Sequence, residues 1–206
     1  MSNSHLRFET RRKLAHILLT FWPILFVFLG FSRFEELVIY TAYLAFMLLS
    51  EFLRIRYDYN TPTAMLLRSV SRSTINGDLK KKWKKVRIPY WIIGSLFAMA
   101  LFGPQIIIAS TVCLTFGDSV SGMTKALLQR RRSPVGIGMG ILVSMILTYI
   151  LTGAALMAIL SSIIGMIGDA SNLVNDNLSI PVLAALGAYL CSITIPKSLR
   201  GITTLW

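Results

Sequence analysis

The chain has 206 residues, of which 54% are hydrophobic and only 15% are charged. A soluble globular protein has about a quarter of its residues charged, so this composition excludes an ordinary soluble globule and indicates a single-domain integral membrane protein. The net charge of +12 does not indicate nucleic-acid binding, because the basic residues flank apolar segments and form no soluble basic domain.

The first half of the chain contains two apolar segments that predict membrane spans. One crossing needs about 20 apolar residues in a helix. The first span is expected at 14–32, after a polar and basic N-terminus in which no cleavable signal is evident. The second is expected at 34–53. The segment 54–87 that follows is the longest polar stretch, and it includes the dense run of lysines at 80–85.

The second half of the chain predicts five more helices. The uncharged run 88–117 is too long for one crossing, and we predict two antiparallel helices joined by a tight turn at Gly103-Pro104. Segment 133–168 is also too long, and Gly153 is the expected turn within it. The polar segment 169–179 then precedes a final span at 180–195. The fold class predicted is therefore an all-α membrane protein with about seven transmembrane helices.

The basic residues predict how these helices are oriented. If seven spans alternate across the membrane, 18 of the 21 Lys and Arg residues fall on one side and 3 on the other. Loops rich in Lys and Arg remain in the cytoplasm. The N-terminus and the basic loop at about 54–87 are therefore expected on the cytoplasmic side of a multi-pass protein.

A polar motif, Gly117 to Lys125, follows the long apolar run. In a helix, Asp118, Ser121, Gly122 and Lys125 share one face. That face would offer a carboxylate, a hydroxyl, a gap for close approach and a cation, which suit a phosphate with a divalent metal. A carboxylate at the end of an apolar run is costly in lipid and indicates a function. The alternative is a helix end whose Asp and Lys are merely solvated.

The other acidic residues at predicted cytoplasmic ends of spans are Glu9, Glu51, Asp169 and Asp176. Glu9 would share a helical face with His16 and with Arg12 or Lys13. Glu51 and Arg54 are three residues apart, so they would form a local ion pair or line the site. His16 could also be an interfacial histidine, and Asp176 could cap the last helix.

Two carboxylates, Asp118 and Asp176, come from separate polar segments on one predicted membrane face. Carboxylates together with phosphates are typical Mg²⁺ ligands, and nearby Arg and Lys would neutralise the remaining phosphate charge. These features predict a nucleoside triphosphate site that acts on a lipid entering from the bilayer. The chain has no P-loop consensus, so the site is not of that type.

Taken together, the motifs resemble the CTP-dependent lipid-alcohol kinases, the group of dolichol kinase, phytol kinase and CTP-dependent diacylglycerol kinases, which is similar to phosphatidate cytidylyltransferases. The resemblance covers nearly the whole chain. It depends on Glu9 to His16, on Glu51 with Arg54, on Gly117-Asp118, and on Asp176 to Pro181, where the family has D-D-N-L-T-I-P. The chain departs from the family at Asn175, which replaces the first Asp of that motif, and Asp169 is at best the counterpart of the Glu that usually precedes it.

The resemblance implies a set of site residues. Asp118 and Asp176 would hold Mg²⁺, and His16, Glu9 or Asp118 would act on the acceptor hydroxyl. Glu9 and His16 would also line the site from the first helix. The residues implied in nucleotide or phosphate binding are Arg12, Lys13, Ser121, Gly122, Lys125, Arg132, Ser133, Gly136 and Asn177.

The resemblance also implies the reaction and the partners. A lipid hydroxyl, of a dolichol- or polyprenol-type isoprenoid or of a diacylglycerol, would attack the γ-phosphorus of CTP. The alternative is a CDP-lipid synthase, in which a lipid phosphate attacks the α-phosphorus. A homo-oligomer remains open. A transporter or structural membrane protein is a third hypothesis, but it predicts charges near the bilayer centre, whereas these charges lie at the ends of spans.

Overall fold

The computed structural model describes residues 10, 13–14, 16–18, 20–57, 90–129, 133–171 and 175–194, with the backbone alone given for Glu51 and 54–57. The regular structure in these ranges is entirely helical, as the sequence predicts. The elements are α2 (Trp22–Phe28), α3 (Arg33–Tyr57), α6 (Tyr90–Leu101), α7 (Pro104–Val112), the π-helical segment η2 (Cys113–Gly117), α8 (Asp118–Leu127), α9 (Pro134–Thr152), α10 (Ala155–Ser171) and α11 (Asp176–Thr194).

Both predicted turns are confirmed, and each has a local cause. Gly103 ends the turn after α6, and Pro104 occupies the first turn of α7, where its fixed φ suits a helix and its missing N–H is not needed. Gly153 ends α9 with φ of +68° and donates its N–H to the Tyr149 carbonyl. That left-handed conformation favours glycine. The chain therefore reverses where the sequence predicts it.

The segment 169–179 is more helical than the sequence predicts. α10 continues to Ser171 and α11 already begins at Asp176, so Pro181 lies inside the last helix. The first turn of α11 is stabilised because Asn175 accepts backbone hydrogen bonds from Leu178 and Ser179 at 2.9 and 3.0 Å. The carboxylate of Asp176 also favours the positive end of the helix dipole.

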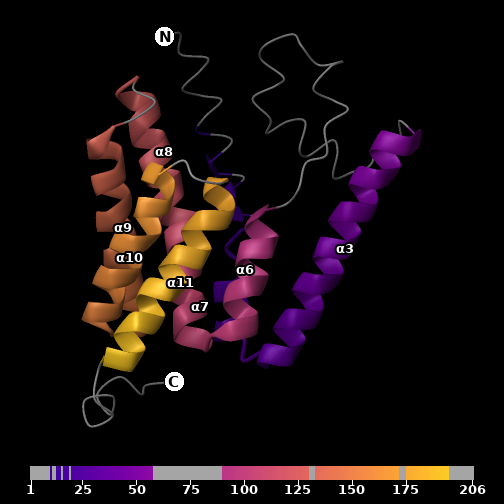
Figure 1. Ribbon diagram of the computed structural model, residues 1–206, viewed down its shortest axis with the longest axis horizontal. Helices are drawn as coiled ribbons and strands as arrows, with labels where there is room; N and C mark the ends of the chain where they lie inside the picture. The colour runs from indigo at the N-terminus through magenta and orange to yellow at the C-terminus, as the bar shows by residue number, and fades with distance from the viewer. Residues whose placement is uncertain are drawn as a thin grey trace.

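The helices form one bundle with a peripheral member (Figure 1). α9, α10 and α11 surround the continuous α7–η2–α8 rod, α6 packs on α11, and α3 contacts α6 and leans away from it toward its C-terminal end. Small residues allow close packing of α10 on α11. A methyl group at Gly165 would lie 2.8 Å from Cβ of Ala184. Such contacts are the usual way in which membrane helices pack.

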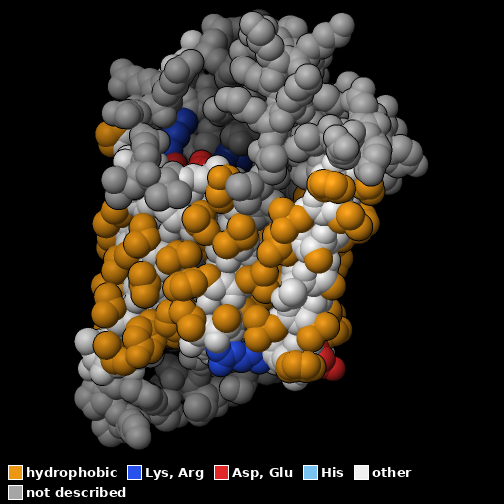
Figure 2. Space-filling model, turned by 45° about the vertical axis from the view of Figure 1, so that its right-hand side comes forward, with side chains coloured by type: hydrophobic (Ala, Val, Ile, Leu, Met, Phe, Trp, Pro, Cys, Tyr) orange, Lys and Arg blue, Asp and Glu red, His pale blue; other side chains and the backbone are white. Residues whose placement is uncertain are grey.

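Three of the described helices are long and apolar enough to cross a membrane: Pro104–Leu127, Pro134–Thr152 and Asp176–Thr194. The most apolar part of Pro104–Leu127 is 78% buried inside the protein, against 22% for Pro134–Thr152. The first is therefore a central helix and the second a peripheral one. Figure 2 shows a broad band of hydrophobic side chains across one face, with charged side chains gathered at its two ends. These features agree with a membrane protein.

Candidate functional site

The site begins where the central helix changes geometry. Between α7 and α8 the backbone widens into the π-helical segment η2, which ends at the residue before Asp118. Such π-bulges are frequent at functional sites because they re-aim the side chains that follow. Asp118 is only 4% exposed, so its charge needs a partner inside the protein.

The helical residues that precede α2, described at 13–14, 16–18 and 20 and called the first helix below, supply that partner. Lys13 Nζ lies 2.5 Å from Oδ2 of Asp118, and the two side chains are 4% and 5% exposed. His16 Nε2 is 3.5 Å from the same oxygen. The sequence predicts that both residues contribute to the site. In the structure both side chains lie next to Asp118, the predicted metal ligand.

Two threonines hold the first helix in register with η2. Thr20 donates its hydroxyl to the His16 carbonyl at 2.8 Å, and the Thr20 and Thr115 hydroxyl oxygens are 2.8 Å apart. Because the only hydroxyl proton of Thr20 goes to His16, Thr115 donates in the second bond. Both threonines are fully buried. A fixed register between the two helices is what allows Lys13 to meet Asp118.

Gly122 provides the space for Lys13. A Cβ atom added at Gly122 would collide with the Cε atom of Lys13. The sequence predicts that Gly122 leaves a gap for a ligand. In the structure the side chain of Lys13 fills that gap and passes along α8 to Asp118.

The other two polar residues of the same face contact Asp169, at the end of α10. Oδ2 of Asp169 accepts hydrogen bonds from the Ser121 hydroxyl at 2.7 Å and from Lys125 Nζ at 2.6 Å. Asp118, Ser121, Gly122 and Lys125 therefore do share one helical face, as predicted. The face is turned inward, toward α10 and the first helix.

Asp176 occupies the first position of α11 and is exposed. Its Oδ1 atom accepts the backbone N–H of Asn177 at 2.9 Å, and Asn175 Oδ1 is 3.1 Å from the same nitrogen. Asn175 thus holds the N-cap position of α11, and Asp176 only accepts the N–H of the residue that follows it. The carbonyl of Asn177 packs near α6, where a methyl on Gly94 would be 3.4 Å away.

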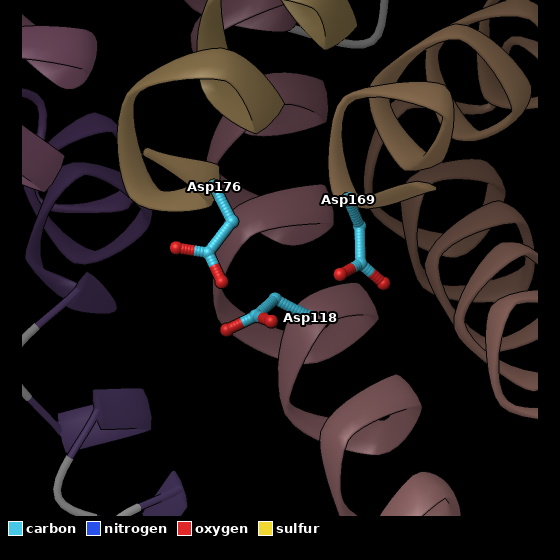
Figure 3. A group of neighbouring side chains, drawn as sticks. All are labelled: Asp118, Asp169 and Asp176. Atoms are coloured by element: carbon cyan, nitrogen blue, oxygen red, sulfur yellow. The ribbon is translucent and has the colours of Figure 1, made fainter. Parts of the chain in front are cut away.

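Three carboxylates meet between α8, α10 and α11 (Figure 3). Asp118, Asp169 and Asp176 each offer an oxygen, and these oxygens lie within 4.8 Å of one another. Ligand oxygens on opposite sides of a bound Mg²⁺ are about 4 Å apart, so small adjustments would allow all three to share one hard cation. Burial decreases from Asp118 through Asp169 to Asp176, which leaves the group approachable from the Asp176 side.

Asp169 is the site residue that sequence reasoning does not select as a ligand. The sequence places it at the end of a span, and it matches a family glutamate only weakly. The signal is nevertheless present, because Asp169 ends an uncharged apolar run just as Asp118 does. A charge at the end of an apolar run is costly in lipid and indicates a function. The same argument that selects Asp118 therefore also selects Asp169.

Ser133 and Gly136 form the start of α9 behind Lys125. The Ser133 hydroxyl accepts the Gly136 N–H at 3.3 Å, which is an ordinary helix cap. A methyl on Gly136 would lie 2.8 Å from Cγ of Lys125, so this turn supports the lysine stem. The remaining predicted site residues lie outside the described residues or have undescribed side chains: Glu9, Arg12, Arg132, Glu51 and Arg54.

Comparison of the chain with family models, with curated proteins and with solved structures finds no match.

Proposed function

We propose that this protein is a CTP-dependent kinase that transfers the γ-phosphate to the hydroxyl of a membrane lipid alcohol, assisted by Mg²⁺ at the cytoplasmic face. One observation carries the proposal. Three carboxylates from three helices lie within 4.8 Å of one another, and two of them contact lysines, at one end of an apolar helical bundle. The choice of CTP as the nucleotide and of a lipid alcohol as the acceptor comes from the resemblance of the motifs to those of the lipid-alcohol kinases.

The proposed topology has seven spans and a cytoplasmic N-terminus. Besides the three long apolar helices, the proposed topology would use α3 and three shorter apolar helices, His16–Phe28, α6 and α10, as spans. The distribution of Lys and Arg supports the orientation. The carboxylates then belong to the cytoplasmic end, where CTP is available.

The residues present fit a magnesium ion. Asp118, Asp169 and Asp176 would hold it, and Mg²⁺ usually combines one or two carboxylates with water and substrate phosphates. When bound, the ion would neutralise charge that develops on the phosphates. Lys13 and Lys125 lie within 2.6 Å of two of these carboxylates. Each could donate to a phosphate oxygen after a small rotation of its flexible stem.

The acceptor hydroxyl needs a group to take its proton. Its oxygen would attack the γ-phosphorus, the bond from that phosphorus to the bridging oxygen would break, and CDP would leave. Asp118 and His16 lie 3.5 Å apart, so either can receive the proton. Asp118 is already paired with Lys13 and is proposed to hold the metal. We therefore assign the proton to His16, oriented by Asp118.

The test incubates the purified protein with Mg²⁺ and separate pools of dolichol, shorter polyprenols, diacylglycerol and phosphatidate. CTP carries the label at the γ-phosphate in one set and at the α-phosphate in another. Transfer of γ-label to an alcohol is the expected result. Transfer of α-label to phosphatidate would instead establish the CDP-lipid synthase. Asp118→Asn should abolish transfer, whereas Glu35→Gln, the same change at the opposite end of the bundle, should not.

A further inference from the structure

A cavity of about 360 Å³ lies between α2, α3 and α6. Its lining consists of Trp22, Phe26, Ile39, Tyr40, Tyr43 and Trp91, of which five are aromatic. Ring contacts stiffen two of its walls, since the centroids of Phe26 and Tyr40 are 6.1 Å apart and those of Tyr43 and Trp91 are 5.8 Å apart. None of the six lining residues is charged.

The cavity suits hydrocarbon better than water. Tyr40 is only 3% exposed, and its hydroxyl has no hydrogen-bond partner in the described part of the chain. An ordered water needs about two to four polar partners, and the lining offers few, namely the hydroxyls of two tyrosines and the indole N–H groups of two tryptophans. A chain of methylene or isoprene units can fill such a space without leaving its own polar groups unpaired.

One wall of the cavity lies near the carboxylates. Trp91 lines the cavity and also packs on a buried cluster that includes Leu114 and Ile180. Leu114 is four residues before Asp118 and Ile180 is four residues after Asp176, which is about one helical turn in each case. Trp91 therefore separates the hydrocarbon-like cavity from the polar site by about one turn of helix.

The other side of the cavity reaches the outer apolar surface. Trp22 is 47% exposed and Ile39 is 36% exposed. Leu18, which precedes α2, and Phe46 on α3 are exposed hydrophobic residues of the kind that face lipid. The cavity is thus open toward the surface that the bilayer would cover, and its wall at Trp91 lies about one helical turn from the carboxylates.

We propose that this cavity binds the hydrocarbon chain of the lipid acceptor, entering laterally between α2 and α3, and directs its hydroxyl end toward Asp118 and Asp176. A cavity of about 150 Å³ is enough to bind a benzene ring, so 360 Å³ accommodates a longer stretch of one hydrocarbon chain. The identity of the lipid as the acceptor rests on the proposed function. The binding of the chain does not.

The test measures chain binding directly, without CTP or Mg²⁺. Phe replaces Trp22, Trp83 and Trp206, so that Trp91 is the only tryptophan. The probe is octadecanol brominated at mid-chain, which quenches nearby indole fluorescence, titrated into the protein in detergent micelles. We expect saturable quenching that reaches its plateau at about one probe per chain.

A second experiment fills the cavity with a bulky label at residue 39 and uses the same label at residue 38 as the matched control. Ile39→Cys is labelled with a benzyl maleimide, while Cys113 and Cys191 are at most 1% exposed and should not react. Val38→Cys, the adjacent residue, is 50% exposed and is not among the lining residues. Labelling at 39 should abolish saturation, while labelling at 38 and the unlabelled Ile39→Cys should retain it.

Quenching that rises linearly with probe and is equal in both labelled variants would overturn the proposal, because it would report only contact with the micelle. The kinase assay is read separately. Saturable binding without phosphate transfer would support the proposal for the cavity and contradict the proposed function. Phosphate transfer without saturable binding would support the proposed function and contradict the proposal for the cavity.

Discussion

Lys13 Nζ and Asp118 Oδ2 meet at 2.5 Å although 105 residues separate them in the sequence. Both side chains are almost completely buried, so each desolvated charge depends on the other. The pair ties the first helix to the central helix at the level of the carboxylate group. The same carboxylate is proposed to hold the metal, so stability and function should be linked at this point.

Removing the lysine should therefore destabilise the protein. Lys13→Met takes the closest cation away from the Asp118 charge, and losing one member of a buried pair costs about 3–5 kcal/mol. We expect a clear decrease in the midpoint of thermal unfolding in detergent. The double variant Lys13→Met/Asp118→Asn should recover most of the loss, because the buried carboxylate charge is gone. Equal destabilisation in single and double variants would contradict a dominant charge effect.

Gly122→Ala should affect activity more than stability. The added methyl would displace the Cε atom of Lys13, which belongs to a flexible side chain, so the energetic cost should be about 1 kcal/mol. The ammonium would remain paired with Asp118 but in a shifted position, and we expect more than about a tenfold loss of lipid phosphorylation. Gly138→Ala is the control, since a methyl added at Gly138 would point into open space. An active Gly122→Ala enzyme would show that the position of Lys13 is unimportant.

Asp169→Asn should weaken metal binding. One of the three converging carboxylates becomes neutral, and Lys125 loses its charged partner. We expect the Mg²⁺ concentration needed for half-maximal activity to rise about tenfold or more, as for other losses around a metal site. Ser121→Ala removes only one hydrogen bond to Asp169 and should produce a smaller shift. An unchanged Mg²⁺ requirement in Asp169→Asn would remove this residue from the metal site.

Arg33 should hold α3 against the end of α6. Its Nε atom donates to the Met99 carbonyl at 2.8 Å and its Nη2 atom donates to Ala100. These carbonyls belong to the last turn of α6, which has no intrahelical donors for them. Arg33→Met should lower the free energy of unfolding by about 1–2 kcal/mol, measured by denaturant titration. Arg33→Lys keeps the charge but loses the forked geometry, so its free energy of unfolding should lie between those of the unsubstituted protein and Arg33→Met.

The proposed topology predicts where the chain ends lie. Seven spans place the two termini on opposite sides of the membrane, with the N-terminus in the cytoplasm. Reporter domains that are active on one side only, fused to either terminus, should therefore give opposite results. The same result at both termini would require an even number of spans. It would also remove the charge argument for a cytoplasmic site.

Features decided by local chemistry could be predicted from the sequence. Glycine and proline determine the turns at Gly103-Pro104 and Gly153, and the spacing from Asp118 to Lys125 determines one helical face. Features decided by the register between helices that are distant in the sequence could not be predicted in this way. The pairing of Lys13 with Asp118 depends on the threonine contact below it and on the space beside Gly122. The apolar run that ends at Asp169 marks this residue, but its contacts with Ser121 and Lys125 depend on how α10 lies beside α8.

The π-helical segment has a consequence for how this protein can change. Residues 113–117 set the rotational phase between the buried half of the central helix and the half that carries Asp118. A π-helical hydrogen bond spans one residue more than an α-helical one, so deleting a single residue there would convert the segment to α-helix and leave Asp118 facing Lys13. A deletion in the regular helix between Asp118 and Lys125 has no such extra residue to lose and would turn Lys125 away from Asp169 by about 100°. The same change in length is thus tolerated before Asp118 and disruptive after it, although both leave the span long enough to cross the bilayer.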